Sequence, residues 1–529
     1  MFFGSIHIRK TIVTLSLSVL GLYGCTTDEQ FPAIDTNFAG PVDVVSVGDY
    51  AFVLNSDFDR KYNTGSILTV DPSQVTGSEK LASHLVPRMG RSLYASGQFL
   101  IGTYDRVELS GMGSVEIYSV ANDGSLSTSY SQELDCSPIS AVISESQSWA
   151  VVSCLGGEVY IAPLDSGNIA STSFHYVRNY GYARRALYIY EQGSTAQLLA
   201  FPTDLGEQTS GDFGGNDVIK YEPNQESTGT DSTVYVDGSN EVPDDFESSA
   251  SKIRSYASRY PYQMAVLNLN VSQDNGFPLK IMASAIEAND TVTLASNGKT
   301  VFEHANNELK FIYFNLDNNG DAPNTNSGTV VADVDSNVLF YRTNFWTAQP
   351  GGTAGEFYLS HRGLAGANDS NNILKVIVNG SDVFAGPAAD TPSEFSNEFK
   401  SMLTISREFG FHAVAKSGYP GDFAVTELNG ENYVFVNQFR DEAYWDASSK
   451  MYAIDAKNTS RNDHESLPPN RWVGADFRLS AYELALIGNS GGADPSYLIS
   501  CSFYGDSMLV FPIDKDNGID IETGPTVIY

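Results

Sequence analysis

Polar side chains suited to ligand binding follow short apolar runs at several places along the chain. They comprise Asn55, Asp57 and Asp59; Tyr104, Asp105 and Arg106; Asp204; His361 and Arg362; and Asn437, Arg440 and Asp441. If the runs are equivalent strands of a repeated sheet, all these groups open on one face and can form one site. The alternative is that Asn and Asp close turns while aromatic residues pack between the sheets.

His361 and Arg362 form the cationic pair of this set, in a strongly acidic protein. A guanidinium can hold a carboxylate through two parallel hydrogen bonds. The pair is therefore the predicted anchor for an anionic group, carried by an envelope protein or by a small ligand. The alternative is an arginine that only neutralises neighbouring aspartates.

Calcium is the one candidate cofactor, since this ion prefers carboxylate and carbonyl oxygens. Asp317, Asn319 and Asp321 have the opening spacing of an EF-hand loop, but Gly328 occupies the twelfth position, where a bidentate Glu is required. The acidic pair at 244–245 is a second option. The alternative for 317–321 is a turn rich in Asn and Gly, so the sequence makes no metal site certain.

The stretch Gly488–Gly492 matches G-x-S-x-G, the nucleophile elbow of serine hydrolases. That elbow requires a strand followed by a helix. Apolar runs typical of strands flank the motif on both sides, so we expect a hairpin turn. The histidines after the first 25 residues also lack the spacing of a zinc site, and whether the protein is an enzyme stays open.

The elements that must position these residues are strands. Residues 52–71 read as two antiparallel strands joined by a polar loop, and variants of this unit recur to the C-terminus. A repeat of about 45 to 50 residues with evenly spaced strands is typical of four-stranded sheets arranged radially. The sequence therefore predicts an all-β protein, a β-propeller with seven blades or, as the alternative, eight.

Three runs that begin with glycine carry a resemblance to a known family. Gly65–Asp71, Gly113–Val120 and Gly157–Leu164 resemble the inner blade strands of lactonase-like and YncE-like bacterial surface propellers. The resemblance covers most of the chain after residue 40 and implies the propeller fold. It also implies one candidate activity, a calcium-assisted hydrolysis of the lactonase type.

The first 24 residues predict a signal peptide, with a charged stretch at 7–10 and an apolar stretch at 11–21. Leu22–Cys25 resembles the lipobox of bacterial lipoproteins. That resemblance implies cleavage before Cys25 and acylation of its thiol, for example with palmitate. Because Thr26 follows in place of an inner-membrane Asp signal, it also implies the outer membrane.

The expected order after the signal peptide is a tether at 25–40 and a propeller at 41–529. No later apolar run reaches the ~18 residues of a spanning helix, so the lipid is the expected membrane contact. An acidic insertion is predicted at 206–258. A capping box at Thr391–Glu394 predicts a short helix through Leu403, either packed on the rim or docking a partner.

The charge balance limits the partners. There are 31 Lys and Arg against 64 Asp and Glu, which gives a formal net charge of −33. Such a field repels phosphate backbones, so nucleic acid is excluded as a partner. Cations, basic partners or a salt-rich habitat fit this charge, and so does an acidic surface that serves solubility alone.

Two cysteines are placed to meet. Cys136 begins one predicted strand and Cys154 ends the next, so a hairpin would bring them side by side. A disulfide or two buried thiols are the alternatives, and Cys501 has no evident partner.

These observations favour a lipoprotein of the cell envelope whose propeller binds other molecules without catalysis. A calcium-assisted hydrolase and an assembly factor for envelope proteins are the alternatives.

Overall fold

The computed structural model describes slightly more than half of the chain, in segments that begin at residue 37. The described ranges are 37–56, 65–74, 79–86, 89–105, 112–144, 146–155, 158–165, 168–179, 183–192, 195–202, 215–221, 253–257, 264–272, 278–285, 290–294, 300–304, 308–314, 328–333, 343–350, 356–363, 372–378, 403–410, 419–439, 449–455, 471–477, 481–488, 494–502, 506–516, 518–519 and 525–529.

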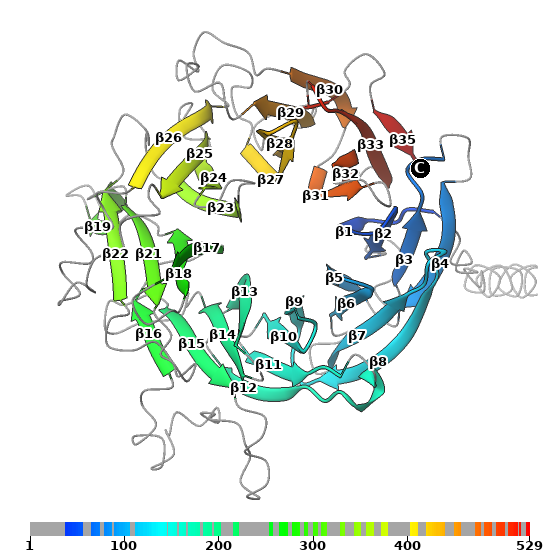
Figure 1. Cartoon of the computed structure of the whole chain (residues 1–529), viewed down its shortest axis with the longest axis horizontal. Helices are drawn as coiled ribbons and strands as arrows, with labels where there is room; N and C mark the ends of the chain where they lie inside the picture. The colour runs from blue at the N-terminus through cyan, green and yellow to red at the C-terminus, as the bar shows by residue number, and fades with distance from the viewer. Residues whose placement is uncertain are drawn as a thin grey trace, which may run out of the picture.

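The described strands form eight sheets of four or five antiparallel strands, each built from consecutive strands of the chain. The sheets are arranged around a ring, with the first strand of each at the centre and later strands towards the rim (Figure 1). This is the β-propeller that the sequence predicts, and each sheet is a blade.

Blades 1 to 4 use the first sixteen strands. Blade 1 is β1 (Pro41–Val47), β2 (Tyr50–Asn55), β3 (Gly65–Val70) and β4 (Lys80–Val86); blade 2 is β5 (Gly90–Ser96), β6 (Phe99–Tyr104), β7 (Gly113–Val120) and β8 (Leu126–Leu134); blade 3 is β9 (Pro138–Ile143), β10 (Trp149–Cys154), β11 (Glu158–Pro163) and β12 (His175–Asn179); blade 4 is β13 (Ala183–Gln192), β14 (Thr195–Pro202), β15 (Gly215–Tyr221) and β16 (Ile253–Ala257).

Blades 5 to 8 follow in the same order, and an extra hairpin interrupts blade 5. Blade 5 is β17 (Met264–Ser272), β18 (Pro278–Ala285), β21 (Glu308–Phe314) and β22 (Gly328–Asp333), with β19 (Asp290–Leu294) and β20 (Thr300–His304) as the hairpin; blade 6 is β23 (Thr343–Pro350), β24 (Glu356–Gly363), β25 (Asn372–Val378) and β26 (Leu403–Gly410); blade 7 is β27 (Tyr419–Leu428), β28 (Glu431–Phe439), β29 (Ser449–Asp455) and β30 (Arg471–Phe477); blade 8 is β31 (Ala481–Gly488), β32 (Pro495–Ser502), β33 (Ser507–Asp514), β34 (Gly518–Ile519) and β35 (Thr526–Ile528).

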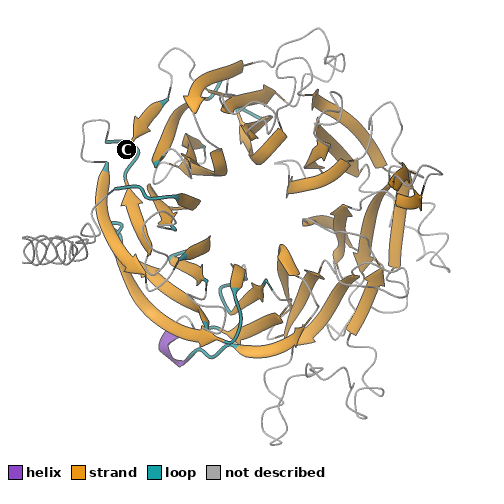
Figure 2. Cartoon of the chain, turned by 180° about the vertical axis from the view of Figure 1, so that it is seen from behind, coloured by secondary structure: helices purple, strands orange, loops and turns teal. Residues whose placement is uncertain are grey.

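Helix is almost absent from the described residues. Figure 2, which shows the ring from behind, draws strands and loops and one short 3-10 helix, Ile169–Ser171. No helix in the described part of the chain is long and apolar enough to cross a membrane.

The two middle strands of blade 1 are buried along almost their whole length, because the blade is covered on both faces. Every residue of β3 is buried, and so is every residue of β2 after Tyr50. The outer strand β4 has only one buried residue, Val86. A continuous apolar run is therefore the pattern of the middle strands, and the predicted pairing within 52–71 is confirmed by the β2–β3 register, in which Ala51 faces Val70.

Two predictions about the repeat differ from the structure. The interval 206–258 holds two strands of blade 4, β15 and β16, and is not a plain insertion. The acidic residues between these strands dominate the composition of the interval and hide the apolar alternation at its two ends. The apolar run that follows this interval, 264–272, is the first strand of blade 5. The preferred count of seven is one fewer than the eight four- or five-stranded sheets described, which equal the alternative count of eight.

The predicted helix at 391–403 overlaps a strand at its last residue. Residues 391–402 lie outside the described residues, but Leu403 is the first residue of β26. The apolar spacing that suggested a helical face therefore ends in the outer strand of blade 6.

The ring closes by packing between blades 8 and 1. A cluster of buried side chains joins them, namely Phe38, Val44, Ala51, Val53, Leu68 and Val70 with Ala485, Ile487, Ile499, Cys501, Met508, Val510 and Ile528. The backbone N–H of Gly40 donates to Oδ1 of Asp506 at 2.7 Å, and Lys80 Nζ donates to the carbonyl oxygen of Tyr529. No strand of blade 1 enters the described sheet of blade 8.

Replacing Phe38 tests this closure. Phe38 is 2% exposed, so Phe38→Ala should lower the free energy of unfolding by about 3 to 5 kcal/mol, the usual cost of removing a buried Phe side chain. Urea unfolding measures the change. The control is Leu85→Ala on β4, which is 55% exposed and should change stability by less than about 0.5 kcal/mol. Equal effects of the two changes would contradict the assigned packing.

Candidate ligand-binding site

One face of the ring is marked by a hydrogen bond that repeats in blades 1, 2 and 3. In each, the residue just after the second strand donates its backbone N–H to the carbonyl of the residue just before the first strand. The bonds run from Ser56 to Gly40 at 3.0 Å, from Asp105 to Met89 at 2.9 Å and from Leu155 to Ser137 at 2.8 Å. The loops after the second strands thus begin beside the segments that lead into the blades, on the face where the sequence predicts a site.

Arg91 projects from β5 at this face and is held by a buried carboxylate. Its Nε donates to Oδ2 of Asp105 at 3.0 Å, and its Nη2 donates to the same oxygen. The other oxygen of Asp105 accepts from the Ser137 hydroxyl at 2.5 Å. The Asp105 side chain is 12% exposed and that of Arg91 is 41% exposed, so the buried acid fixes a cation that still faces solvent.

The segment that leads into blade 3, Cys136 and Ser137, is also hydrogen-bonded to blade 2 through its backbone. Gly113, the first residue of β7, donates its N–H to the Cys136 carbonyl at 2.9 Å. A Cβ at Gly113 would lie 2.2 Å from Pro138 Cδ and 2.5 Å from the Cys136 carbonyl oxygen. Only glycine permits this approach, which explains why the third-strand run begins with glycine in blade 2.

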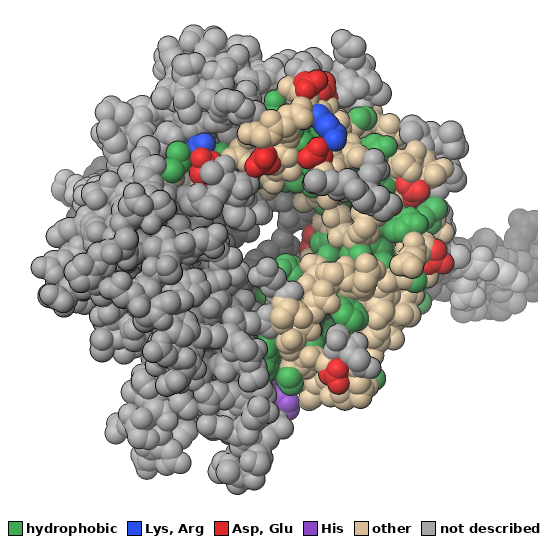
Figure 3. All heavy atoms as spheres, viewed as in Figure 1, with side chains coloured by type: hydrophobic (Ala, Val, Ile, Leu, Met, Phe, Trp, Pro, Cys, Tyr) green, Lys and Arg blue, Asp and Glu red, His purple; other side chains and the backbone are tan. Residues whose placement is uncertain are grey.

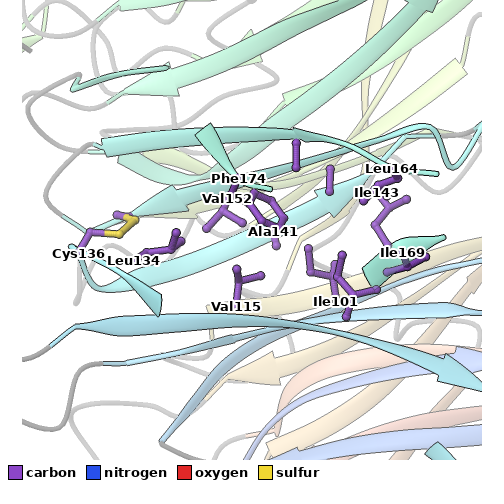
Figure 4. Close-up of a cluster of buried hydrophobic side chains, with 14 residues drawn as sticks. Ile101, Val115, Leu134, Cys136, Ala141, Ile143, Val152, Leu164, Ile169 and Phe174 are labelled. Carbon is purple, nitrogen blue, oxygen red and sulfur yellow. A yellow bond between two sulfur atoms is a disulfide. The ribbon is translucent and has the colours of Figure 1, made fainter. Parts of the chain in front are cut away.

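A disulfide joins Cys136 and Cys154, with 5.9 Å between their Cα atoms. Figure 4 shows it at one end of the apolar cluster between blades 2 and 3, beside Leu134 and Val152. The bond links the start of the β9–β10 hairpin to its end. The lead-in segment of blade 3, Cys136 and Ser137, is therefore fixed covalently as well as by hydrogen bonds.

Asn55 is one of three predicted ligand residues with a described side chain, the others being Tyr104 and Asp105. It is completely buried, and its amide contacts the segment before β1. Its Oδ1 accepts from the N–H of Ala39 at 3.2 Å, while Nδ2 donates to the Asn37 carbonyl at 3.3 Å and to Ser66 Oγ at 3.0 Å. Asn55 thus positions the chain that leads into blade 1.

Tyr104 is another predicted ligand residue, and it too is completely buried. Its hydroxyl lies 2.5 Å from that of Tyr118, which donates to Oε2 of Glu116. Gly102 leaves room for the Tyr104 ring, since a Cβ there would lie 2.2 Å from the tyrosine oxygen. The group belongs to the contact of blades 1 and 2, and Ser131 Oγ donates to the other Glu116 oxygen at 3.1 Å.

Burial controls the ionisation of this group. Desolvation raises the pKa of Tyr104 and that of Tyr118 well above the usual value, and the Glu116 carboxylate acts in the same direction. The rings of His84 and Tyr118 pack edge to face, with 5.2 Å between their centroids. Desolvation lowers the pKa of His84, an effect that Glu116 partly offsets.

The remaining predicted residues fall on strands or outside the described residues. His361 and Arg362 lie within β24, where they pair with Phe345 and Asn344 of β23, and Asn437 lies within β28 facing Met451. Asp57, Asp59, Arg106, Asp204, Arg440, Asp441, Asp317, Asn319, Asp321, the pair at 244–245 and Cys25 lie outside the described residues.

Arg91 was not predicted because it lies within the first strand of blade 2, whereas the predicted residues follow the apolar runs. Arg91 is the second residue of a first strand, where the pairing with β6 shifts between Gly90 and Ser92. Such bulges re-aim side chains near sites. The sequence signal for Arg91 was a basic residue directly after Gly90, at the start of the first strand of blade 2.

Two further sequence motifs can be placed. The G-x-S-x-G stretch connects β31 and β32, which pair antiparallel, so the expected hairpin is confirmed and the strand–helix elbow is not formed. Within the described part of the chain, no three His, Cys, Asp or Glu side chains are grouped to hold a metal ion.

No protein-family model matches the chain, and no curated protein matches it. Solved structures similar to it include Sqt1 of Chaetomium thermophilum, at 11% identity over 90% of this chain and 96% of that one, with a TM-score of 0.48. A putative 6-phosphogluconolactonase of Bacteroides fragilis has 9% identity over 94% and 95%, with 0.37. Hydrazine synthase of Kuenenia stuttgartiensis has 13% over 91% and 98%, with 0.42. Identities this low carry no function to this chain.

The tyrosine pair predicts a loss of stability in alkali. Unfolded tyrosines ionise near pH 10, whereas burial keeps Tyr104 and Tyr118 protonated in the fold. The unfolded state therefore releases these protons first, and the free energy of unfolding should fall as pH rises above about 10. Urea unfolding between about pH 8 and 11 measures this fall. The double variant Tyr104→Phe, Tyr118→Phe should show a shallower fall, and an unchanged slope would contradict the assignment.

Proposed function

We propose that this chain is a lipid-anchored β-propeller of the outer membrane that binds other envelope proteins and acts as a scaffold without catalysing a reaction. The observation that carries the proposal is the exposed Arg91 held by Asp105 on the face marked by the repeated lead-in bonds. A cation fixed on a rigid ring suits recognition, because little side-chain entropy is lost when a partner binds.

The charge of the protein supports the same proposal. Figure 3 shows one face of the ring, where the described charged side chains are mostly acidic. A net charge of −33 keeps such proteins apart from one another and from anionic surfaces. Contact with a partner must then depend on local features, and Arg91 supplies one.

The anchor follows from the lipobox-like stretch Leu22–Cys25. Acylation of Cys25 would place the ring at the membrane surface through a tether of about fifteen residues, which spans at most about 50 Å when extended. Such a tether lets the ring reach neighbouring envelope proteins without a spanning segment of its own.

Replacing Cys25 tests the anchor. Cells grown with an alkyne analogue of palmitate should label the native chain, and Cys25→Ala should abolish the labelling and shift the protein from the outer-membrane fraction. Cys501→Ala is the control, because Cys501 is buried and should not be acylated. Labelling that persists in Cys25→Ala would contradict the anchor.

Cross-linking in the envelope tests the binding role. The native chain should give a small set of partners that is reproducible and that survives competition by an unrelated acidic protein. The purified chain should not hydrolyse a panel of lactones, with or without millimolar calcium. Turnover of any lactone, together with a calcium-dependent rise of Tm as expected for a ligand of the folded state, would replace this proposal by the calcium-assisted hydrolase.

A further inference from the structure

Three exposed side chains surround the lead-in segment of blade 3. Arg91, Met112 and Leu155, named here the mouth patch, have side-chain or residue exposures of 41%, 40% and 40%. They come from β5, from the residue before β7 and from the residue after β10. The mouth patch therefore spans blades 2 and 3.

Hydrogen bonds hold the three members close to one another. Leu155 donates its N–H to the Ser137 carbonyl at 2.8 Å. The neighbour of Met112, Gly113, donates to the carbonyl of Cys136 at 2.9 Å. Arg91 reaches Ser137 through Asp105, whose second oxygen accepts the serine hydroxyl at 2.5 Å. All three members are thus tied to two consecutive residues.

The backbone beneath the mouth patch is held by several links, which favours a specific ligand. The disulfide of Cys136 ties the lead-in segment to the end of β10, and the backbone of Gly113 packs closely against Cys136 and Pro138. Preorganised groups bind more tightly because fewer motions are lost on binding. Exposed large apolar side chains are otherwise few in the described part of the chain, so two of them beside a fixed arginine form a distinctive surface.

The chemistry of the mouth patch defines its partner. An arginine favours a carboxylate, which it can hold through two hydrogen bonds, and Met112 and Leu155 favour apolar side chains. The charge of −33 repels a partner with many acids. A segment with one carboxylate between apolar residues satisfies both conditions, because the ion pair is local and the rest of the contact is uncharged.

We propose that the mouth patch binds a peptide segment of a partner protein in which a single Glu or Asp is flanked by apolar side chains. This inference rests on the proposed binding function and names the chemistry that the ring recognises. The carboxylate pairs with Arg91 while Asp105 holds the guanidinium in place. The apolar side chains cover Met112 and Leu155.

Three fluorescein-labelled decapeptides with the same glycine-serine flanks test the proposal. Their centres are Leu-Glu-Leu, Leu-Gln-Leu and Ser-Glu-Ser, and binding to the mature full chain in detergent is followed by anisotropy. Leu-Glu-Leu should bind most tightly. Loss of the carboxylate or of both leucines should weaken binding about tenfold or more, as expected for a hydrogen bond to a charged group or for apolar burial.

Variants assign the effect to the mouth patch. Arg91→Gln should remove the preference for Glu over Gln, and Arg91→Lys should restore only part of it, because lysine keeps the charge and loses the fork. Met112→Ser and Leu155→Ser should weaken Leu-Glu-Leu but not Ser-Glu-Ser. The control is Leu85→Ser on the outer strand of blade 1, where the leucine is 55% exposed; this variant should bind like the native chain.

Two outcomes overturn the proposal. One is equal binding of the Glu and Gln peptides by the native chain, and the other is a Glu preference that survives in Arg91→Gln with an unchanged melting curve. The cross-linked partners separate this failure from that of the binding function. If Arg91→Gln leaves their recovery intact, the ring binds elsewhere and the scaffold role stands. If no specific partner is recovered, the scaffold role itself fails.

Discussion

The short backbone segment that leads into each blade is the element on which the ring depends. In blade 3 its Ser137 carbonyl accepts from the same blade and its Cys136 carbonyl accepts from blade 2. In blade 1 the Gly40 carbonyl accepts from Ser56 of the same blade, and the Gly40 N–H donates to Asp506 of blade 8. In both places one short backbone segment forms hydrogen bonds with two neighbouring blades. Apolar clusters pack between the blades, and these bonds connect the backbone of one blade to its neighbour.

The class of fold was predictable from local signals. The runs beginning at Gly65 and Gly113 were predicted to be strands, and both are strands. Their resemblance to inner blade strands is not matched by their place in the sheets, where each is the third of four strands. The number of blades was not predictable in the same way. The hairpin β19–β20 interrupts blade 5, and a long acidic stretch of sequence separates β15 from β16, so the spacing of the repeat is lost where its length changes. Pairing between strands, which is a long-range property, is needed to assign these segments.

For the candidate site, the position of the predicted residues at strand ends was predictable, and their exposure to solvent was not. The sequence predicted that polar residues at the ends of equivalent strands share one face, and Asn55 and Tyr104 do end the second strands of blades 1 and 2. It could not tell which polar side chains stay exposed there. Asn55 and Tyr104 are completely buried, whereas the Arg91 side chain, on the first strand of blade 2, is 41% exposed. Burial of a single side chain depends on the neighbouring blade, and the local pattern holds no information about it.

The boundary between blades 8 and 1 has one property that no other boundary between consecutive blades shares. Each described sheet is made from one continuous stretch of chain, so every other neighbouring pair is joined by a peptide linkage. Among the described residues, side-chain packing and hydrogen bonds connect blades 8 and 1, as at Phe38 and Gly40. The strength of this boundary is therefore the strength of that packing and those bonds, whereas the chain itself ties the blades together at the others.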